Sequence, residues 1–252
     1  MTRPEAAGSF LPIWDGIYPH LRDVPADGSS YDDERRIGEM LRFAQGALAK
    51  QRTGTDPGLW HDALAVLAGG IAAERGAVDV LDVGGALGTA YIHLLATLPS
   101  SARIGFRIID QEKMCAAGRQ LFAGDPRIAF DTSLDGQRGV PDVVYANSVL
   151  PYVEDYAGFL RRLADLGARD MLIGRLAGGS YPTYATRQLN LAGQVLPYWF
   201  HNTDEVKDIL RMSGYVVVYE GLTGPDYDQR NFPASHRVGR MRNLLFRRQG
   251  GA

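Results

Sequence analysis

The chain has 252 residues, of which 45% are hydrophobic and 22% charged, and its formal net charge is -2. This composition excludes wholesale disorder and gives no general electrostatic support for a nucleic-acid partner. A single cysteine, Cys115, excludes an intramolecular disulfide framework and fits a reducing compartment. No apolar run reaches the roughly 18 residues of a membrane-spanning helix, and the N-terminal stretch lacks a hydrophobic signal core, so we expect a cytoplasmic protein without membrane attachment.

The first third of the chain divides into an arm and a helical region. Residues 1–31 are rich in Pro, Gly and aromatic side chains and predict an ordered arm or loop. Residues 32–76 predict two helices, of which the second is weakened by its Gly-Gly pair. The first has apolar side chains near a 3.6-residue period at Ile37, Met40, Leu41, Ala44 and Leu48. We therefore expect residues 1–76 to form an arm and helical lid ahead of a second unit at 77–252.

From residue 77 onward, short apolar runs alternate with helical patterns. Such alternation implies right-handed crossovers and a mainly parallel sheet that is covered on both faces. The expected strands lie at 77–83, 103–110, 127–131, 141–148, 168–176, 215–221 and 242–248. The last two are expected to close the sheet as an antiparallel edge. Asn202 and Glu205 have capping-box spacing ahead of a helix, whereas residues 176–200 predict a long irregular insertion.

A glycine-rich turn follows the first of these strands, in the stretch "VLDVGGALGTA" at 80–90. The spacing fits neither the dinucleotide-binding pattern nor a P-loop. Asp82 stands two residues ahead of the turn, where a pyrophosphate would meet a like charge. S-adenosylmethionine (SAM) carries an ammonium and a sulfonium but no phosphate, so an acid at this place suits it. Gly84 and Gly88 would let the backbone approach its methionine part, although glycines needed only for packing remain an alternative.

The segment "LDVGGALG" resembles the D-x-G-x-G-x-G motif of class I SAM-dependent methyltransferases, with Ala86 at the middle glycine. The resemblance implies a Rossmann-like α/β fold with a seven-stranded, mainly parallel sheet and an antiparallel edge strand. It also implies SAM as cofactor, released as S-adenosylhomocysteine (SAH). Asp110 would accept hydrogen bonds from the ribose hydroxyls, if it is not a plain helix cap, and Asp131 would face the adenine amino group. The cofactor-binding residues implied are Asp82, Gly84, Gly85, Gly88, Asp110, Gln111, Asp131, Asn147 and Ser148.

A narrower resemblance rests on "WDGIYPH", "YDDE", "PDVVYANSVLPYVED" and "LPYWF". These segments are similar to a family of bacterial methyltransferases that often occur among polysaccharide or secondary-metabolite biosynthesis genes. The resemblance implies a small-molecule acceptor, with O-methylation of a sugar or secondary-metabolite intermediate expected and a carboxylate or nitrogen acceptor left open. The segment "YATRQLNLAGQVLPYWFHN" at 184–202 departs most from the family pattern, and the insertion at 176–200 is expected to shape the acceptor pocket. By analogy with other small-molecule methyltransferases, the helices at 32–76 would form a homodimer surface.

A hydroxyl acceptor benefits from a general base, and His201 is the candidate chosen, with Asp15 or a tyrosine as alternatives. His93 is expected to be structural, while His61 and His236 lack supporting context. The aromatic arm is either a hydrophobic clip or a lid over the acceptor cleft. The expected acceptor contacts are Trp14, Tyr18, Tyr152, Arg187, Gln188 and Tyr198. No cluster has convincing metal-ligand spacing, so no metal is expected. A SAM-binding module that has lost transfer is the alternative function, and the failed glycine spacing argues against a Rossmann oxidoreductase.

Overall fold

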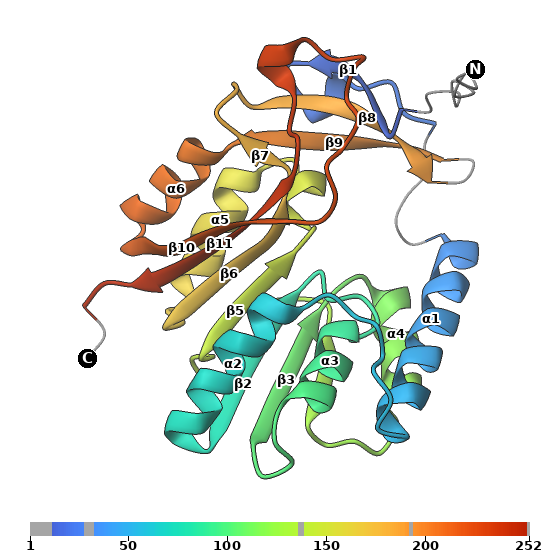
Figure 1. Ribbon diagram of the computed structural model, residues 1–252, viewed down its shortest axis with the longest axis vertical. Helices are drawn as coiled ribbons and strands as arrows, with labels where there is room; N and C mark the ends of the chain where they lie inside the picture. The colour runs from blue at the N-terminus through green and yellow to red at the C-terminus, as the bar shows by residue number, and fades with distance from the viewer. Residues whose placement is uncertain (1–11, 28–32, 136–138, 192–193, 251–252) are drawn as a thin grey trace, which may run out of the picture.

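The computed structural model describes residues 12–27, 33–135, 139–191 and 194–250 (Figure 1). Within these ranges the main sheet has seven strands in the order β10-β11-β6-β5-β2-β3-β4. They are β2 (Ala77–Val83), β3 (Arg103–Ile109), β4 (Ile128–Asp131), β5 (Val143–Asn147), β6 (Asp170–Leu176), β10 (Tyr215–Thr223) and β11 (Met241–Arg248). The pairs from β6 to β4 are parallel, whereas β11 runs antiparallel to both β6 and β10. The predicted mainly parallel α/β sheet is confirmed, and its antiparallel strand lies one place in from the edge.

Helices cover both faces of this sheet (Figure 1). They are α1 (Glu34–Arg52), α2 (Asp62–Arg75), α3 (Thr89–Thr97), α4 (Glu112–Leu121), α5 (Tyr156–Asp165) and α6 (Thr203–Met212), with short 3-10 turns η1 (Leu21–Asp23), η2 (Leu150–Tyr152) and η3 (Ala234–His236). Strand β2 shows how the two layers form. Val78 and Val80 pack with the core beneath α1 to α4, whereas Leu81 and Val83 pack with the core beneath α5 and α6. Side chains of a strand alternate between faces, so a strand that is apolar on both faces is covered on both.

Helix α6 begins where the sequence indicates a cap. The side-chain oxygen of Asn202 accepts hydrogen bonds from the backbone N–H groups of Asp204 at 2.8 Å and Glu205 at 3.1 Å, and α6 starts at the next residue. These bonds satisfy two of the donors that a helix N-terminus leaves unpaired. Both Gly167 and Gly214, which follow the ends of α5 and α6, have the positive φ that ends helices in this way.

A second sheet corrects the expectation for residues 176–200, which are not irregular. In the described residues this sheet has the order β1-β8-β9-β7, formed by β1 (Trp14–Tyr18), β7 (Gly178–Gly179), β8 (Tyr184–Leu191) and β9 (Gln194–Asn202). Three consecutive aromatic residues of β9, Tyr198, Trp199 and Phe200, are all buried. A strand buried on both faces has no polar–apolar alternation, and Pro197 interrupts its pattern further.

The second sheet also includes a strand from the N-terminal arm, β1. Strand β1 pairs with β8 in antiparallel register, with Trp14 opposite Gln188. In Figure 1 this sheet lies above the main sheet, on the side toward which the parallel strands run. The arm and the insertion, far apart in sequence, therefore form one layer over that end of the molecule.

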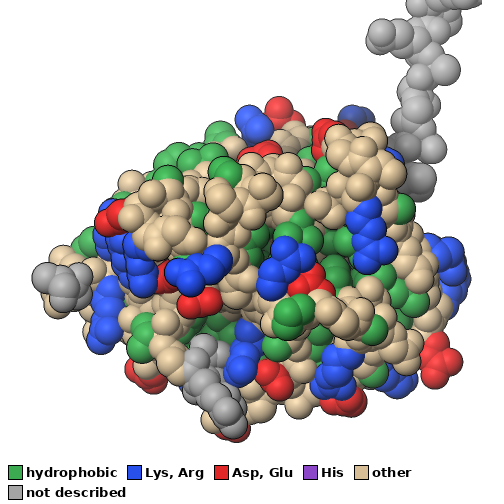
Figure 2. Space-filling model, turned by 90° about the horizontal axis from the view of Figure 1, so that it is seen from below, with side chains coloured by type: hydrophobic (Ala, Val, Ile, Leu, Met, Phe, Trp, Pro, Cys, Tyr) green, Lys and Arg blue, Asp and Glu red, His purple; other side chains and the backbone are tan. Residues whose placement is uncertain are grey.

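The surface carries charges of both signs. On the face that Figure 2 shows, Lys and Arg side chains are interspersed with Asp and Glu, in keeping with the formal net charge of -2. Among the described residues, no helix combines the length and apolar character that crossing a membrane requires.

Candidate functional site

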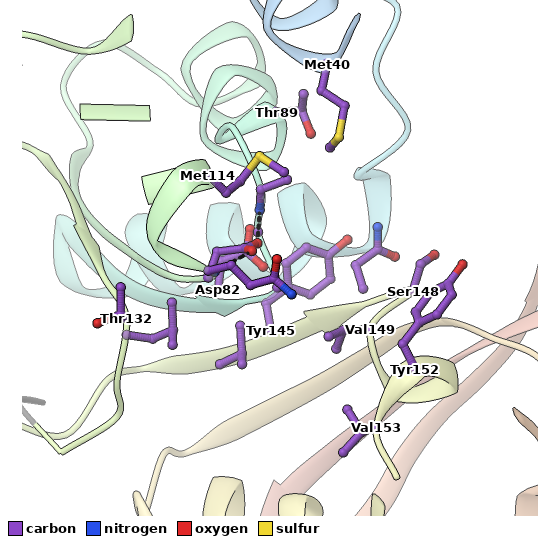
Figure 3. Close-up of a pocket in the computed structure, with 18 of the residues that line it drawn as sticks. Met40, Asp82, Thr89, Met114, Thr132, Tyr145, Ser148, Val149, Tyr152 and Val153 are labelled. Carbon is purple, nitrogen blue, oxygen red and sulfur yellow. Dashed lines mark hydrogen bonds between the residues drawn. The ribbon is translucent and has the colours of Figure 1, made fainter. Parts of the chain in front are cut away.

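A cavity of about 760 Å³ opens at the carboxyl ends of β2, β3 and β5. In open α/β sheets, ligands bind beyond this edge of the sheet. Figure 3 shows Met114 and Thr132 at one end of the cavity and Ser148 and Tyr152 at the other, with Asp82 and Tyr145 between them. The glycine-rich turn that follows β2 forms part of its wall, so the turn identified from the sequence borders this cavity.

The conformation of the turn explains its small residues. Gly84 has φ +74°, and a Cβ built on it would lie 2.6 Å from Cγ2 of Val149. A Cβ on Gly85 would lie 2.5 Å from Oδ2 of Asp82. Ala86, at the middle glycine of the motif, has φ +48°, a left-handed conformation that costs a residue with a Cβ roughly 1–2 kcal/mol. The alanine thus keeps the backbone path that the motif's glycine would take, with local strain.

Asp82 lies beneath this turn with 2% of its surface exposed. Its strand neighbours are Ile108 on β3 and Tyr145 on β5. Burial, and then the nearby Asp110, raise the pKa of Asp82 well above its usual range. Among the described residues that line the cavity, Arg36 on α1 is the only Arg or Lys. A buried carboxyl of this kind favours a ligand that brings its own positive charge, because the cation would stabilise the ionised form.

Asp110 connects the end of β3 to the glycine turn. Its Oδ2 accepts a hydrogen bond from the backbone N–H of Ala86 at 2.8 Å, and its Oδ1 accepts one from Gln111 at 2.7 Å. Burial raises the pKa of Asp110, and the two backbone hydrogen bonds oppose this effect. A carboxylate has about four acceptor positions, so both oxygens can accept further hydrogen bonds from ligand hydroxyls. The same side chain therefore holds the turn and faces the cavity.

Most of the predicted cofactor residues line the cavity, namely Asp82, Gly84, Gly85, Asp110, Gln111, Asn147 and Ser148. Gly88 and Asp131 do not. Gly88 caps α3, where a Cβ would lie 3.0 Å from Cε2 of Phe122, so its part is packing. Asp131 pairs with Arg107 at 3.4 Å from Nε to Oδ2, and its neighbour Thr132 lines the cavity instead. Asp131, the last residue of β4, is therefore turned toward Arg107, and the cavity is lined by the residue that follows the strand.

The predicted placement of His201 at the mouth of the cavity is wrong. Its side chain has no exposed surface, and its ring lies 4.7 Å from that of Tyr156, between their centroids. Burial lowers the pKa of His201 to about 3, so the ring is neutral at pH 7. Because β9 is buried on both faces, its histidine belongs to the core rather than to the wall of the cavity.

Of the six predicted acceptor contacts, Tyr152 alone is among the described residues that line the cavity. Trp14 and Tyr198 are each 3% exposed, and their rings pack 5.7 Å apart in an aromatic core. Arg187 forms an ion pair with Asp15 across β8 and β1. These side chains hold the second sheet together. Of the two roles expected for the aromatic arm, they fit the hydrophobic clip and not the lid over the cavity.

The remaining two residues lie behind the cavity or away from it. Gln188 is 7% exposed and accepts a hydrogen bond from the hydroxyl of Tyr152, at 2.7 Å between the oxygens. It therefore supports a lining residue from the second sheet. The ring of Tyr18 folds back over Gly16 and packs against the small cluster that contains Leu21 and Trp199.

A hydrogen-bonded group in the cavity wall escaped the sequence-based reasoning. Nδ1 of His61 lies 3.0 Å from the hydroxyl of Tyr145, and Nε2 lies 3.2 Å from Oγ1 of Thr89. All three residues line the cavity. Burial, then His93 and Arg175, lower the pKa of His61 to about 4. Because the partners of His61 lie 84 and 28 residues away in sequence, no local pattern could reveal the group.

Within the described ranges, no group of three or more His, Cys, Asp or Glu side chains could hold a metal ion.

No family model and no curated protein matches the sequence. Solved structures do match. Magnesium protoporphyrin IX methyltransferase from Synechocystis PCC 6803, with bound SAH, is 18% identical, with 86% of this chain and 96% of that chain covered and a TM-score of 0.54. A 1,6-didemethyltoxoflavin-N1-methyltransferase from Burkholderia thailandensis is 18% identical over 92% and 94% of the chains, with a TM-score of 0.49. An amino pentose methyltransferase from Micromonospora echinaspora is 14% identical, with 75% of this chain and 92% of that chain covered and a TM-score of 0.49. With the sheet order and the cavity described above, the first of these likenesses establishes that the chain has the Rossmann-like fold of class I methyltransferases.

Proposed function

We propose that the protein is a SAM-dependent methyltransferase that acts on a small molecule. The observation that carries this proposal is the buried carboxyl of Asp82 beneath the glycine turn, next to Asp110 at the end of the neighbouring strand. SAM would supply a methyl group that is already activated on a sulfonium. Asp82 would hold its ammonium, and Asp110 would accept hydrogen bonds from its ribose hydroxyls.

The two ends of the cavity suit different parts of the reaction. Met114 and Thr132, which line the cavity away from Ser148 and Tyr152, would flank the adenosine (Figure 3). Ser148 and Tyr152, at the opposite end, would face the acceptor. A cavity of about 760 Å³ falls within the range typical of small-molecule sites, which supports a small acceptor rather than a polymer. Because the donor is activated, much of catalysis at such a site is positioning of the acceptor.

We further propose oxygen as the methylated atom, in a sugar or secondary-metabolite intermediate. The support is the resemblance of the arm and strand segments to biosynthetic methyltransferases, and the polar side chains of Asn147, Ser148 and Tyr152 at the acceptor end. Carboxylate and nitrogen acceptors are the alternatives. A SAM-binding module without transfer is a second candidate, which the burial of His201 away from the cavity favours.

Calorimetry with SAM and SAH tests the proposal. We expect both to bind the wild-type protein and neither to bind Asp82→Ala. Absence of wild-type binding at millimolar concentration would reject the proposal. A mass-spectrometric search of cell extracts for a SAM-dependent product heavier by one methylene group then separates the candidates. Binding without a methylated product favours the module that has lost transfer.

A further inference from the structure

We propose that the hydroxyl of Thr89 donates a hydrogen bond to the carboxylate of the methionine part of SAM, and that His61 and Tyr145 fix the direction of that bond. This inference rests on the proposed function. It assigns a ligand contact and two positioning residues to the hydrogen-bonded group in the cavity wall.

Three separate elements bring this group together. Tyr145 lies in β5, His61 is the residue before α2, and Thr89 is the first residue of α3. The imidazole lies between the two hydroxyls, with Nδ1 3.0 Å from Tyr145 and Nε2 3.2 Å from Thr89. The side chain of His61 thus joins the β5 wall of the cavity to the start of α3.

The chain of hydrogen bonds has a direction because the imidazole is neutral. With its pKa lowered to about 4 by burial and by His93 and Arg175, the ring has one donor and one acceptor nitrogen at pH 7. Tyr145 and Thr89 therefore cannot both donate to it. A phenol O–H is a stronger hydrogen-bond donor than an aliphatic hydroxyl. Burial, and then the nearby Asp82, raise the pKa of Tyr145 well above its usual range, so the phenol keeps the proton that it donates. We infer that Tyr145 donates to Nδ1 and that the Nε2–H of His61 donates to Thr89.

This direction leaves the hydroxyl hydrogen of Thr89 for a ligand. A threonine inside a helix can donate to the carbonyl four residues before it, as Thr97 does to His93 at 2.8 Å near the end of α3. Thr89 is the first residue of the helix and has no helical carbonyl behind it. Since Thr89 lines the cavity, its hydrogen is placed for an acceptor there.

The charges around the cavity indicate which acceptor this is. Arg36 lines the cavity from α1, and Met40, one helical turn later, lies beside Thr89 (Figure 3). A cation and a hydroxyl donor favour an anion, whereas Asp82 favours a cation. The amino-acid end of SAM presents both charges on one carbon. A carboxylate on the acceptor molecule is the other source of the same chemistry.

Binding of two probes by calorimetry separates these sources. SAH carries the amino-acid end, and 5′-methylthioadenosine shares the adenosine but lacks that end. We expect Thr89→Val to weaken SAH binding about tenfold, the usual effect of losing a hydrogen bond to a charged group. Binding of 5′-methylthioadenosine should not change. Thr89→Ser should restore SAH binding, and Thr97→Val, which removes a hydroxyl from the same helix outside the cavity, should have no effect.

Tyr145→Phe tests the direction of the chain. Without the phenol, the ring of His61 is free to accept from Thr89, so SAH binding should weaken while 5′-methylthioadenosine binding stays. In the wild type, the ¹⁵N resonances of His61, assigned by their loss in His61→Gln, should report a neutral ring with its proton on Nε2. A proton on Nδ1 would overturn the direction.

Other outcomes distinguish the failure of this inference from that of the proposed function. If Thr89→Val weakens the binding of both probes equally, Thr89 has a structural role and the inference is overturned. Unchanged SAH binding would also overturn it, because the methionine carboxylate would then not be the partner of Thr89. A wild-type protein that binds neither probe would instead reject the proposed function, and the inference with it.

Discussion

The contact between Gly85 and Asp82 offers a sharp test of how the turn is built. A Cβ at residue 85 would lie 2.5 Å from Oδ2 and 2.6 Å from Cγ of Asp82. Ordinary contact begins at 3.4 Å, so the carboxyl group must move by about 0.9 Å to reach it. Asp82 is 2% exposed and packed between β3 and β5, so its carboxyl group can be displaced only toward the cavity that it lines. We therefore expect Gly85→Ala to lower the free energy of unfolding by about 1–3 kcal/mol, as overpacking does elsewhere.

Urea denaturation measures this loss, and thermal unfolding should show a decrease in Tm of about 4–8 °C for a loss of about 2 kcal/mol. Calorimetry should show SAH affinity falling by tenfold or more, because the displaced carboxyl no longer faces the ligand. Gly46→Ala is the matched control. Gly46 is an exposed residue inside α1, and a Cβ on it would meet nothing within 4 Å. This change should instead stabilise the protein by up to about 1 kcal/mol.

A double-mutant cycle tests the cause. In an Asp82→Ala background the two closest atoms are gone and only Cβ of residue 82 remains, at 3.1 Å. Gly85→Ala should therefore destabilise the protein less there, by about 1–2 kcal/mol of coupling. The reasoning is refuted if Gly85→Ala alone keeps both wild-type stability and SAH affinity. It is also refuted if the full loss persists after Asp82 is removed.

Three further predictions concern the turn and the buried histidine. The pKa of Asp82 is raised in the folded protein, so its contribution to stability is fully present below pH about 4 and is lost as the pH rises through the raised pKa. In denaturation curves measured across pH, Asp82→Asn should flatten this decline in stability. Ala86→Val should destabilise by about 1–3 kcal/mol in urea melts, since a β-branched residue fits φ +48° poorly, and wild-type stability would contradict the strain argument. His201→Ala should lose about 2–4 kcal/mol of stability yet keep SAH affinity; a protein as stable as wild type would mean that His201 is not a core residue.

The parallel sheet and the part of the cavity wall that contains Asp82 and Asp110 could be predicted from sequence because local patterns encode them. Each strand from β2 to β6 is a short apolar run followed by a turn or helix signal. Parallel strands end at a common edge, so Asp82, Asp110 and Asn147 could be assigned to one site without coordinates. The helix caps are equally local, as Asn202 shows, because their hydrogen bonds span only a few residues.

The rest of the cavity wall was decided by tertiary packing. His201 was chosen for its position next to a helix, yet β9 is buried on both faces and takes it into the core. His61 was set aside, yet the fold carries it to Tyr145 and Thr89. Local sequence periodicity does not predict such contacts, since they depend on how distant elements pack.

By itself, the sequence determined the order of the strands and helices of the main sheet, the glycine turn and the acid ahead of it, because those features arise from neighbours along the chain. Only the tertiary structure decided that the arm and the insertion pair as one sheet and that a histidine from the start of α2 enters the cavity wall. Backbone pairing and side-chain burial between distant segments depend on which surfaces fit together in space, and a local pattern carries no record of that fit.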